Sequence, residues 1–133
     1  MLYEDIQLGG VYQFERTILA EDVQAFAALS GDTNPLHMDP ACGAQSVFGK
    51  NIVHGLLIGS LFSKLVGVYC PGDTSLYVSQ TAQFKAPIFV GDTVLVRGEV
   101  TQKHDSLQMI RLKTEALVEG KVKVTGEAVV KVL

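Results

Sequence analysis

The sequence predicts an α+β fold in which an antiparallel sheet curls around one long buried helix. The first observation is the stretch 54–69, whose large apolar side chains point to every side of a helix. The second is the alternation of apolar and polar residues from residue 77 onward, which indicates antiparallel strands with one dry face. A sheet that curls around the helix is an economical way to bury both surfaces.

Length and composition are those of a single globular domain. The 133 residues form one predicted domain, 1–133, long enough to bury a core without disulfides or metal. The net charge of −3 gives no electrostatic footprint for nucleic acid, and no Lys or Arg run indicates a membrane surface. Cys42 and Cys70 form no Cys-x-x-Cys pattern, and acids stand where a signal peptide would have lysines. We therefore expect a cytoplasmic protein with no nucleic acid and no membrane partner.

The first elements expected along the chain are a strand and a short helix. Residues 11–19 mix β-branched and aromatic residues with polar ones, which favours a strand. Apolar residues then recur at near-helical spacing, and Glu21 and Asp22 suit the positive end of a helix dipole. Gly31 suits the end of that helix, so the helix stops immediately before Asp32.

The stretch 30–40 contains one glycine and two prolines, which oppose a helix or a central strand and predict a loop. It places a carboxylate, Asp32, and an imidazole, His37, five residues apart. A carboxylate and an imidazole fixed on one loop indicate acid/base chemistry. The alternative is structural: Asp32 and Asn34 would be Asx-turn residues, and His37 a structural histidine.

Two further segments separate this loop from the strands. Residues 38–53 predict a long loop with one turn of helix at 41–46, and loops of this length are usually functional. The 54–69 helix is too short to span a bilayer and is interrupted by Lys64, so a core helix fits better. Its small residues would let a backbone or a ligand approach closely, although tight packing alone is an alternative explanation. These small residues are Gly55, Gly59, Ser60, Ser63 and Gly67.

The second half of the chain predicts strands separated by turns. Pro87 and the Gly91-Asp92 pair mark a turn after the first of them. Gly98 and Gly126 are available to ease the curvature of the sheet. The expected strands span residues 77–85, 94–100, 110–116 and 121–132.

Four segments follow a known family pattern. They are 30–39 (Ser-Gly-Asp-Thr-Asn-Pro-Leu-His-Met-Asp), Phe48 with 52–55 (Ile-Val-His-Gly), 84–88 (Phe-Lys-Ala-Pro-Ile) and 90–93 (Val-Gly-Asp-Thr). Together they resemble the MaoC-type, (R)-specific enoyl-CoA hydratase family, or hydratase 2, over nearly the whole chain. The first segment is specific to this family, whereas the strand signature from 84 is shared across the hot-dog superfamily. The resemblance is greatest to the short hydratases that supply (R)-3-hydroxyacyl-CoA for polyhydroxyalkanoate synthesis, and it implies a hot-dog fold.

The resemblance also implies a site. Asp32 and His37 match the family's catalytic pair, and Gly55 matches the glycine whose backbone N–H forms the oxyanion hole. It further implies an acyl-CoA thioester substrate, no cofactor or metal, and a homodimer whose sheets join edge to edge with the pocket at the interface. The substrate-binding residues expected on the same basis are Ser63, Asn34 and Phe48.

Hydration of a 2-enoyl thioester explains why these groups are needed. The reaction needs a base at the water attacking C3, a proton for C2 and stabilisation of the enolate oxygen. Asp32 would be the base, and His37 would hold the water and take part in proton transfer. Gly55, at the start of a helix, would offer an amide N–H and the positive end of the helix dipole.

Rival interpretations remain. Asp32, His37, Asp39 and His54 could be metal ligands, but they follow no zinc pattern and hydration needs no metal, so His54 is expected to be structural. Nothing nearby marks Cys42 as a low-pKa nucleophile. The other functions that stay open are dehydration of 3-hydroxyacyl groups on acyl carrier protein, thioester hydrolysis, and non-catalytic acyl binding, against which the intact Asp32 and His37 argue.

Overall fold

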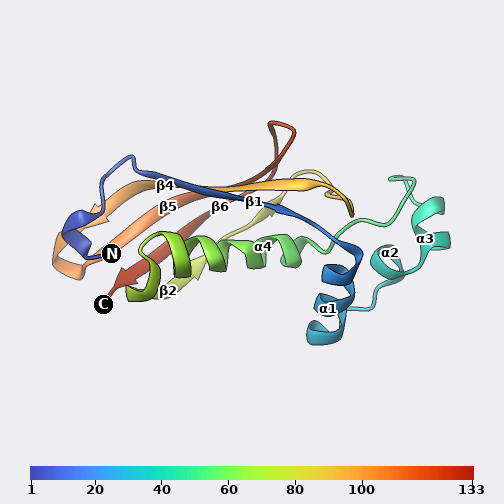
Figure 1. Cartoon of the computed structure of the whole chain (residues 1–133), viewed down its shortest axis with the longest axis horizontal. Coiled ribbons are helices and arrows are strands. Elements are labelled where there is room, and N and C mark those ends of the chain that lie inside the picture. Colours follow the sequence, from blue (N-terminus) through green and yellow to red (C-terminus); the bar gives the residue numbers. More distant parts are fainter.

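A computed structural model describes residues 1–133 and shows one antiparallel sheet with a long helix packed against one face (Figure 1). The strand order is β1-β4-β5-β6-β2, and β3 pairs with β6. This arrangement confirms the predicted α+β, hot-dog fold, and strands form in each region where they were predicted. The strands are β1 (Val11–Thr17), β2 (Ser75–Gln80), β3 (Gln83–Phe84), β4 (Thr93–His104), β5 (Met109–Val118) and β6 (Lys121–Val132).

The helices are unevenly distributed along the molecule. The fourth α-helix and its continuation run across the sheet, while the three α-helices that precede it lie together beyond one end of the sheet (Figure 1). The first ends at Gly31, whose left-handed backbone (φ 78°) matches the predicted stop. The α-helices are α1 (Ala20–Ser30), α2 (Pro35–Met38), α3 (Pro40–Gln45) and α4 (Gly55–Lys64), and α4 continues as a π-helical segment, Leu65–Tyr69. Short 3₁₀ turns lie at Tyr3–Asp5, Gly72–Thr74 and Asp105–Leu107.

The prediction of a loop throughout residues 30–40 is wrong, because both prolines begin short helices. Pro35 and Pro40 occupy the first helical positions, where the N–H that proline lacks would have no intrahelical partner. The preceding residues, Asn34 and Asp39, cap these helices: each side-chain oxygen accepts the N–H two residues on, at 3.0 Å. The chain around Asp32 and His37 is therefore more ordered than its composition indicates.

The main core lies between α4 and the sheet. Ile58, Phe62 and Leu65 are at most 1% exposed and pack with buried residues of the strands. On the opposite face of the helix, Leu56 and Val68 are 67% and 66% exposed. The composition of the helix predicts burial nearly all round. The structure instead buries only the face that meets the sheet.

Two glycines make room for close neighbours where the sequence suggested curvature. A Cβ atom at Gly98 would lie 2.6 Å from Cδ2 of Leu65, so this glycine lets α4 approach the sheet. A Cβ at Gly126 would collide with the carbonyl oxygen of Thr81. Thr81 bonds to Glu127 through both its N–H and its hydroxyl, at 2.9 Å each, and here the predicted strand 77–85 divides into β2 and β3.

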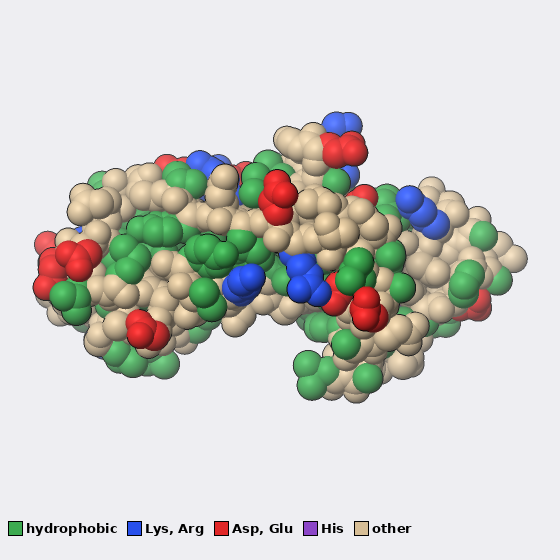
Figure 2. All heavy atoms as spheres, in the orientation of Figure 1, with side chains coloured by type: hydrophobic (Ala, Val, Ile, Leu, Met, Phe, Trp, Pro, Cys, Tyr) green, Lys and Arg blue, Asp and Glu red, His purple; other side chains and the backbone are tan.

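On the face drawn in Figure 2, hydrophobic side chains gather where α4 crosses the sheet, and charged side chains of both signs are scattered around them. No helix is long and apolar enough to cross a membrane.

Candidate active site

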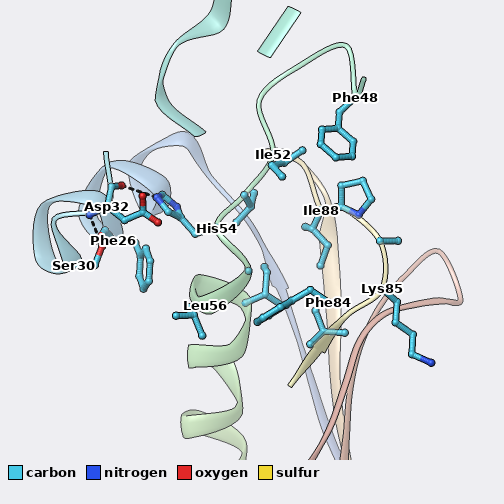
Figure 3. Close-up of a pocket in the computed structure, with 16 residues that line it drawn as sticks. Phe26, Ser30, Asp32, Phe48, Ile52, His54, Leu56, Phe84, Lys85 and Ile88 are labelled. Atoms are coloured by element: carbon cyan, nitrogen blue, oxygen red, sulfur yellow. Dashed lines mark hydrogen bonds between the residues drawn. The ribbon is translucent and has the colours of Figure 1, made fainter. Parts of the chain in front are cut away.

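The candidate site is a cavity of about 690 Å³ between the end of α1, the start of α4 and the segment after β3 (Figure 3). Ten of its 16 lining residues are hydrophobic, so the cavity suits an apolar ligand with a small polar group. Its polar corner is formed by Asp32 and His54. The wall opposite is formed by Phe48, Phe84 and Ile88.

Asp32 directly follows the glycine that ends α1. Its backbone N–H donates to Ser30 Oγ at 3.1 Å, and its Oδ1 accepts the N–H of Asn34 at 3.2 Å. The Asx turn that the structural alternative predicts is therefore present. The second carboxylate oxygen, Oδ2, has no hydrogen bond within the chain, and the residue is exposed. One carboxylate can thus shape the turn and still accept a proton.

His37 lies on α2 with its ring fixed by one main-chain hydrogen bond. Nδ1 lies 2.8 Å from the carbonyl oxygen of Ile52. Because a carbonyl only accepts, this bond assigns the proton to Nδ1 and leaves a lone pair on Nε2. That lone pair can hold a water or take a proton from it.

Three side chains meet at this corner. One carboxylate oxygen of Asp32 and one ring nitrogen each of His37 and His54 lie within 4.8 Å of one another. The sequence motif predicts the meeting of the first two. Asp39, the fourth residue weighed as a metal ligand, is not in this group and caps α3 instead. A carboxylate beside two imidazoles is also a proton-transfer cluster, because each group can hold a proton or give it up.

His54 is the residue of this cluster that sequence reasoning did not assign to the site. It is 1% exposed, and its Nε2 lies 2.9 Å from the backbone oxygen of Asp32. Its ring centroid lies 4.0 Å from that of His37 and 4.8 Å from that of Phe26. The signal available in the sequence was its place directly before Gly55 in the Ile-Val-His-Gly segment.

Gly55 is the first residue of α4 and lines the cavity. Its N–H points back from the first helical turn and has no acceptor within the chain. A Cβ at this position would lie 2.9 Å from the ring of Phe84, so glycine is needed where that ring packs. The unpaired N–H and the positive end of the helix dipole together can bind an anionic oxygen.

The remaining predicted residues are placed differently. Phe48 lines the cavity, as expected of a substrate contact. The side-chain oxygen of Asn34 caps α2, and Ser63 lies exposed on α4, eight residues after Gly55; neither lines the cavity of the single chain. His37 does not line the cavity, but its ring lies against that of His54, which does.

Known proteins and solved structures resemble this chain over nearly its whole length. A model of the MaoC like domain family matches residues 6–128. An (R)-specific enoyl-CoA hydratase of Aeromonas caviae is 44% identical over 132 residues, which are 98% of this chain and 98% of that protein. A solved structure described as an (R)-hydratase from A. caviae involved in PHA biosynthesis, also 44% identical, has a TM-score of 0.95 and covers 98% of this chain and 99% of that one. The mitochondrial 3-hydroxyacyl-acyl-carrier-protein dehydratase FERN of Solanum lycopersicum is 32% identical over 126 residues, 92% of this chain and 75% of that protein. The family model spans nearly the whole chain and the fold is shared throughout, so this chain belongs to the MaoC-like domain family.

Proposed function

We propose that this chain is an (R)-specific enoyl-CoA hydratase, which adds water reversibly to a trans-2-enoyl-CoA to give the (R)-3-hydroxyacyl-CoA. The observation that carries the proposal is that the Asp32 carboxylate and the unpaired N–H of Gly55 line one cavity, with the His37 imidazole close to Asp32 beside it. These are the base, the oxyanion donor and the partner in proton transfer that hydration requires.

In this mechanism the thioester carbonyl oxygen accepts the N–H of Gly55 at the start of α4. A water molecule held by Asp32 and the Nε2 of His37 loses a proton to this pair as its oxygen bonds to C3. The C2=C3 electrons move toward the carbonyl, and the negative charge that develops on the thioester oxygen is stabilised by the fixed N–H and the helix dipole. A proton from the same pair then bonds to C2, which regenerates the carbonyl and restores the site.

Coenzyme A is the proposed carrier of the acyl group. The A. caviae enoyl-CoA hydratase is 44% identical to this chain over 132 residues. Two mitochondrial acyl-carrier-protein dehydratases are less similar, one 37% identical over 90 residues and the other 32% identical over 126 residues. The mostly apolar cavity is suited to an acyl chain, and its polar corner to the reacting carbons. In this proposal Asp32 and His37 carry out the proton transfers and Gly55 binds the thioester oxygen. The proposed substrate-binding residues are Phe48, Asn34 and Ser63.

The proposed assembly is a homodimer. Leu56 on α4 and Val68 on its π-helical continuation are exposed on the face away from the sheet. The edge strand β2 exposes Leu76 and Val78 by 50% and 54%. An apolar helix face beside an unpaired strand edge is a surface that a second copy can cover. Ser63 lies on α4 and would approach the site through this interface. The free state of both cysteines, Cys42 and Cys70, supports action in the reducing cytoplasm.

The direct test is spectroscopic. Purified protein is added to crotonyl-CoA, and the ultraviolet absorbance of the conjugated enoyl thioester is followed. Loss of this absorbance without release of free thiol supports hydration. Release of free thiol, detected with a disulfide reagent, would instead identify a thioesterase, and no change in either signal would support a non-catalytic binding module.

A further inference from the structure

His54 is one of two buried polar side chains, and it is the one whose hydrogen bonding is incomplete. Thr114, the other, accepts a hydrogen bond from Gln80 at 2.9 Å. The Nδ1 of His54 has no partner, and no other buried side-chain nitrogen or oxygen in the chain is left in this state. Burying an unpaired polar atom costs stability that an apolar side chain would not cost. The imidazole therefore needs an explanation other than packing.

Helix capping does not provide that explanation. His54 is the residue that precedes α4, and its backbone carbonyl accepts the first helical N–H groups. Its side chain, however, makes no capping bond. The Nε2 instead lies 2.9 Å from the backbone oxygen of Asp32, and because a carbonyl only accepts, Nε2 is the donor.

This bond is distinctive among the contacts of residues 31–34. Every other hydrogen bond of that segment joins residues at most four positions apart: Gly31 to Ala27, Asp32 to Ser30, and Asn34 to its neighbours. The bond from His54 is thus the only hydrogen bond between the segment that bears the carboxylate and a distant part of the chain. Figure 3 shows it joining the turn after α1 to the start of α4.

The same side chain also contacts the other proposed catalytic group. The ring of His54 lies against that of His37, and the residue that follows it is Gly55. One buried imidazole therefore contacts the base and its partner, and its backbone is covalently joined to the oxyanion donor.

We propose that His54 is a positioning residue, which holds the Asp32 turn and the His37 ring in fixed geometry against the Gly55 N–H. The proposal rests on the proposed hydratase function. His54 does not exchange a proton with substrate; it sets the separation between the group that takes the water's proton and the group that binds the enolate oxygen. Because reacting groups displaced by about 1 Å can lose about a hundredfold in rate, a single hydrogen bond at this point controls kcat.

Three substitutions of His54 distinguish the contributions of its side-chain length, its ring and its hydrogen-bond donor. Gln places an amide N–H near the position of the imidazole Nε2, so His54→Gln can still donate to Asp32. Asn carries the same amide on a shorter side chain and cannot reach, so His54→Asn is the matched control. Phe keeps a ring against His37 but has no donor. We expect His54→Asn and His54→Phe to lower kcat about a hundredfold with KM nearly unchanged, and His54→Gln to retain most of kcat.

Hydrogen exchange provides a second readout that needs no substrate. Amides of residues 31–34 should exchange faster in His54→Asn and His54→Phe than in the wild type and His54→Gln. The variants are compared at the same interval below their melting temperatures, so that differences in global stability do not contribute. If His54→Asn fails to fold, the Phe and Gln variants give the same comparison. Equal loss of kcat in all the folded variants, wild-type kcat in His54→Phe, or unchanged exchange would overturn the proposal. If the wild-type protein does not hydrate enoyl-CoA, the proposed function fails, while the exchange experiment still decides whether His54 holds the turn.

Discussion

The imidazole rings of His37 and His54 lie with their centroids 4.0 Å apart and their planes tilted by 33°. One ring belongs to the short helix α2 and the other to the residue that precedes α4. Their contact brings together a proton-transfer group and the start of the helix whose first N–H is free. The site thus depends on how these two separate elements pack together.

Replacing Asp32 with Asn should remove nearly all hydratase activity and leave the fold intact. An amide can preserve the Asx turn, because its oxygen still accepts the N–H of Asn34, but it cannot take a proton from water. We expect kcat to fall by about a hundred- to ten-thousandfold, the range of acid/base contributions. Steady-state kinetics with crotonyl-CoA and a thermal melt test this together, and a folded variant with wild-type kcat would rule out Asp32 as the base.

Substitution of His37 by Gln should lower kcat far more than it raises KM, since the Nε2 lone pair acts on the water rather than on substrate binding. The loss should be about a hundredfold or more. The third histidine, the exposed His104 on β4, is the matched control, and His104→Gln should keep wild-type kinetics. An effect confined to KM in His37→Gln would make His37 a binding residue instead.

Much of the fold follows from local patterns. The alternation in 94–100, 110–116 and 121–132 predicts the long strands, because successive side chains of a strand point to opposite faces of the sheet. The apolar stretch 54–69 likewise predicts the helix that packs on the sheet. Its open face was not predictable, since apolar composition alone does not distinguish a face that meets the sheet from one left for a partner.

Less of the site than of the fold could be predicted from the sequence, for a physical reason. Pro35 and Pro40 oppose the interior of a helix yet favour its first position, so the same residues can mean a loop or two short helices. The place of His54 depends on tertiary packing: its burial and its bond to Asp32 arise only when α1, α2 and α4 meet. The motif indicates Asp32 and His37, but no local pattern describes the support behind them.

Adding one methyl group at Gly55 should impair catalysis more than folding. The new Cβ of Gly55→Ala would lie 2.9 Å from the ring of Phe84 and would displace that ring or the first turn of α4. We expect a loss in kcat of about tenfold or more, because the N–H that binds the enolate oxygen moves with the turn. Phe84→Ala removes the collision, so Gly55→Ala should lower kcat less in the Phe84→Ala background than in the wild type. A Gly55→Ala enzyme with unchanged kinetics would show that the ring yields freely.

The exposed edge strand should be needed for assembly. Val78 is 54% exposed on β2, and a lysine there would place a charge where we propose that a second sheet edge pairs. Multi-angle light scattering should give a dimer mass for the wild type and a reduced dimer fraction for Val78→Lys. Val47→Lys is a suitable control, because Val47 is 95% exposed and lies outside β2 and α4. A monomeric wild type with full activity would contradict the homodimer.

Hydration on one defined face of the double bond is tested most directly by the configuration of the product from crotonyl-CoA. Asp32 lines the cavity and His37 lies close to Asp32 just outside the cavity wall, so base, water and proton source should all act on one face. The product is oxidised in parallel by an (S)-specific and an (R)-specific 3-hydroxyacyl-CoA dehydrogenase, without an epimerase. We expect rapid formation of reduced nicotinamide with the (R)-specific enzyme and almost none with the (S)-specific one. Rapid reduction with the (S)-specific enzyme would contradict both the proposed function and the proposed geometry.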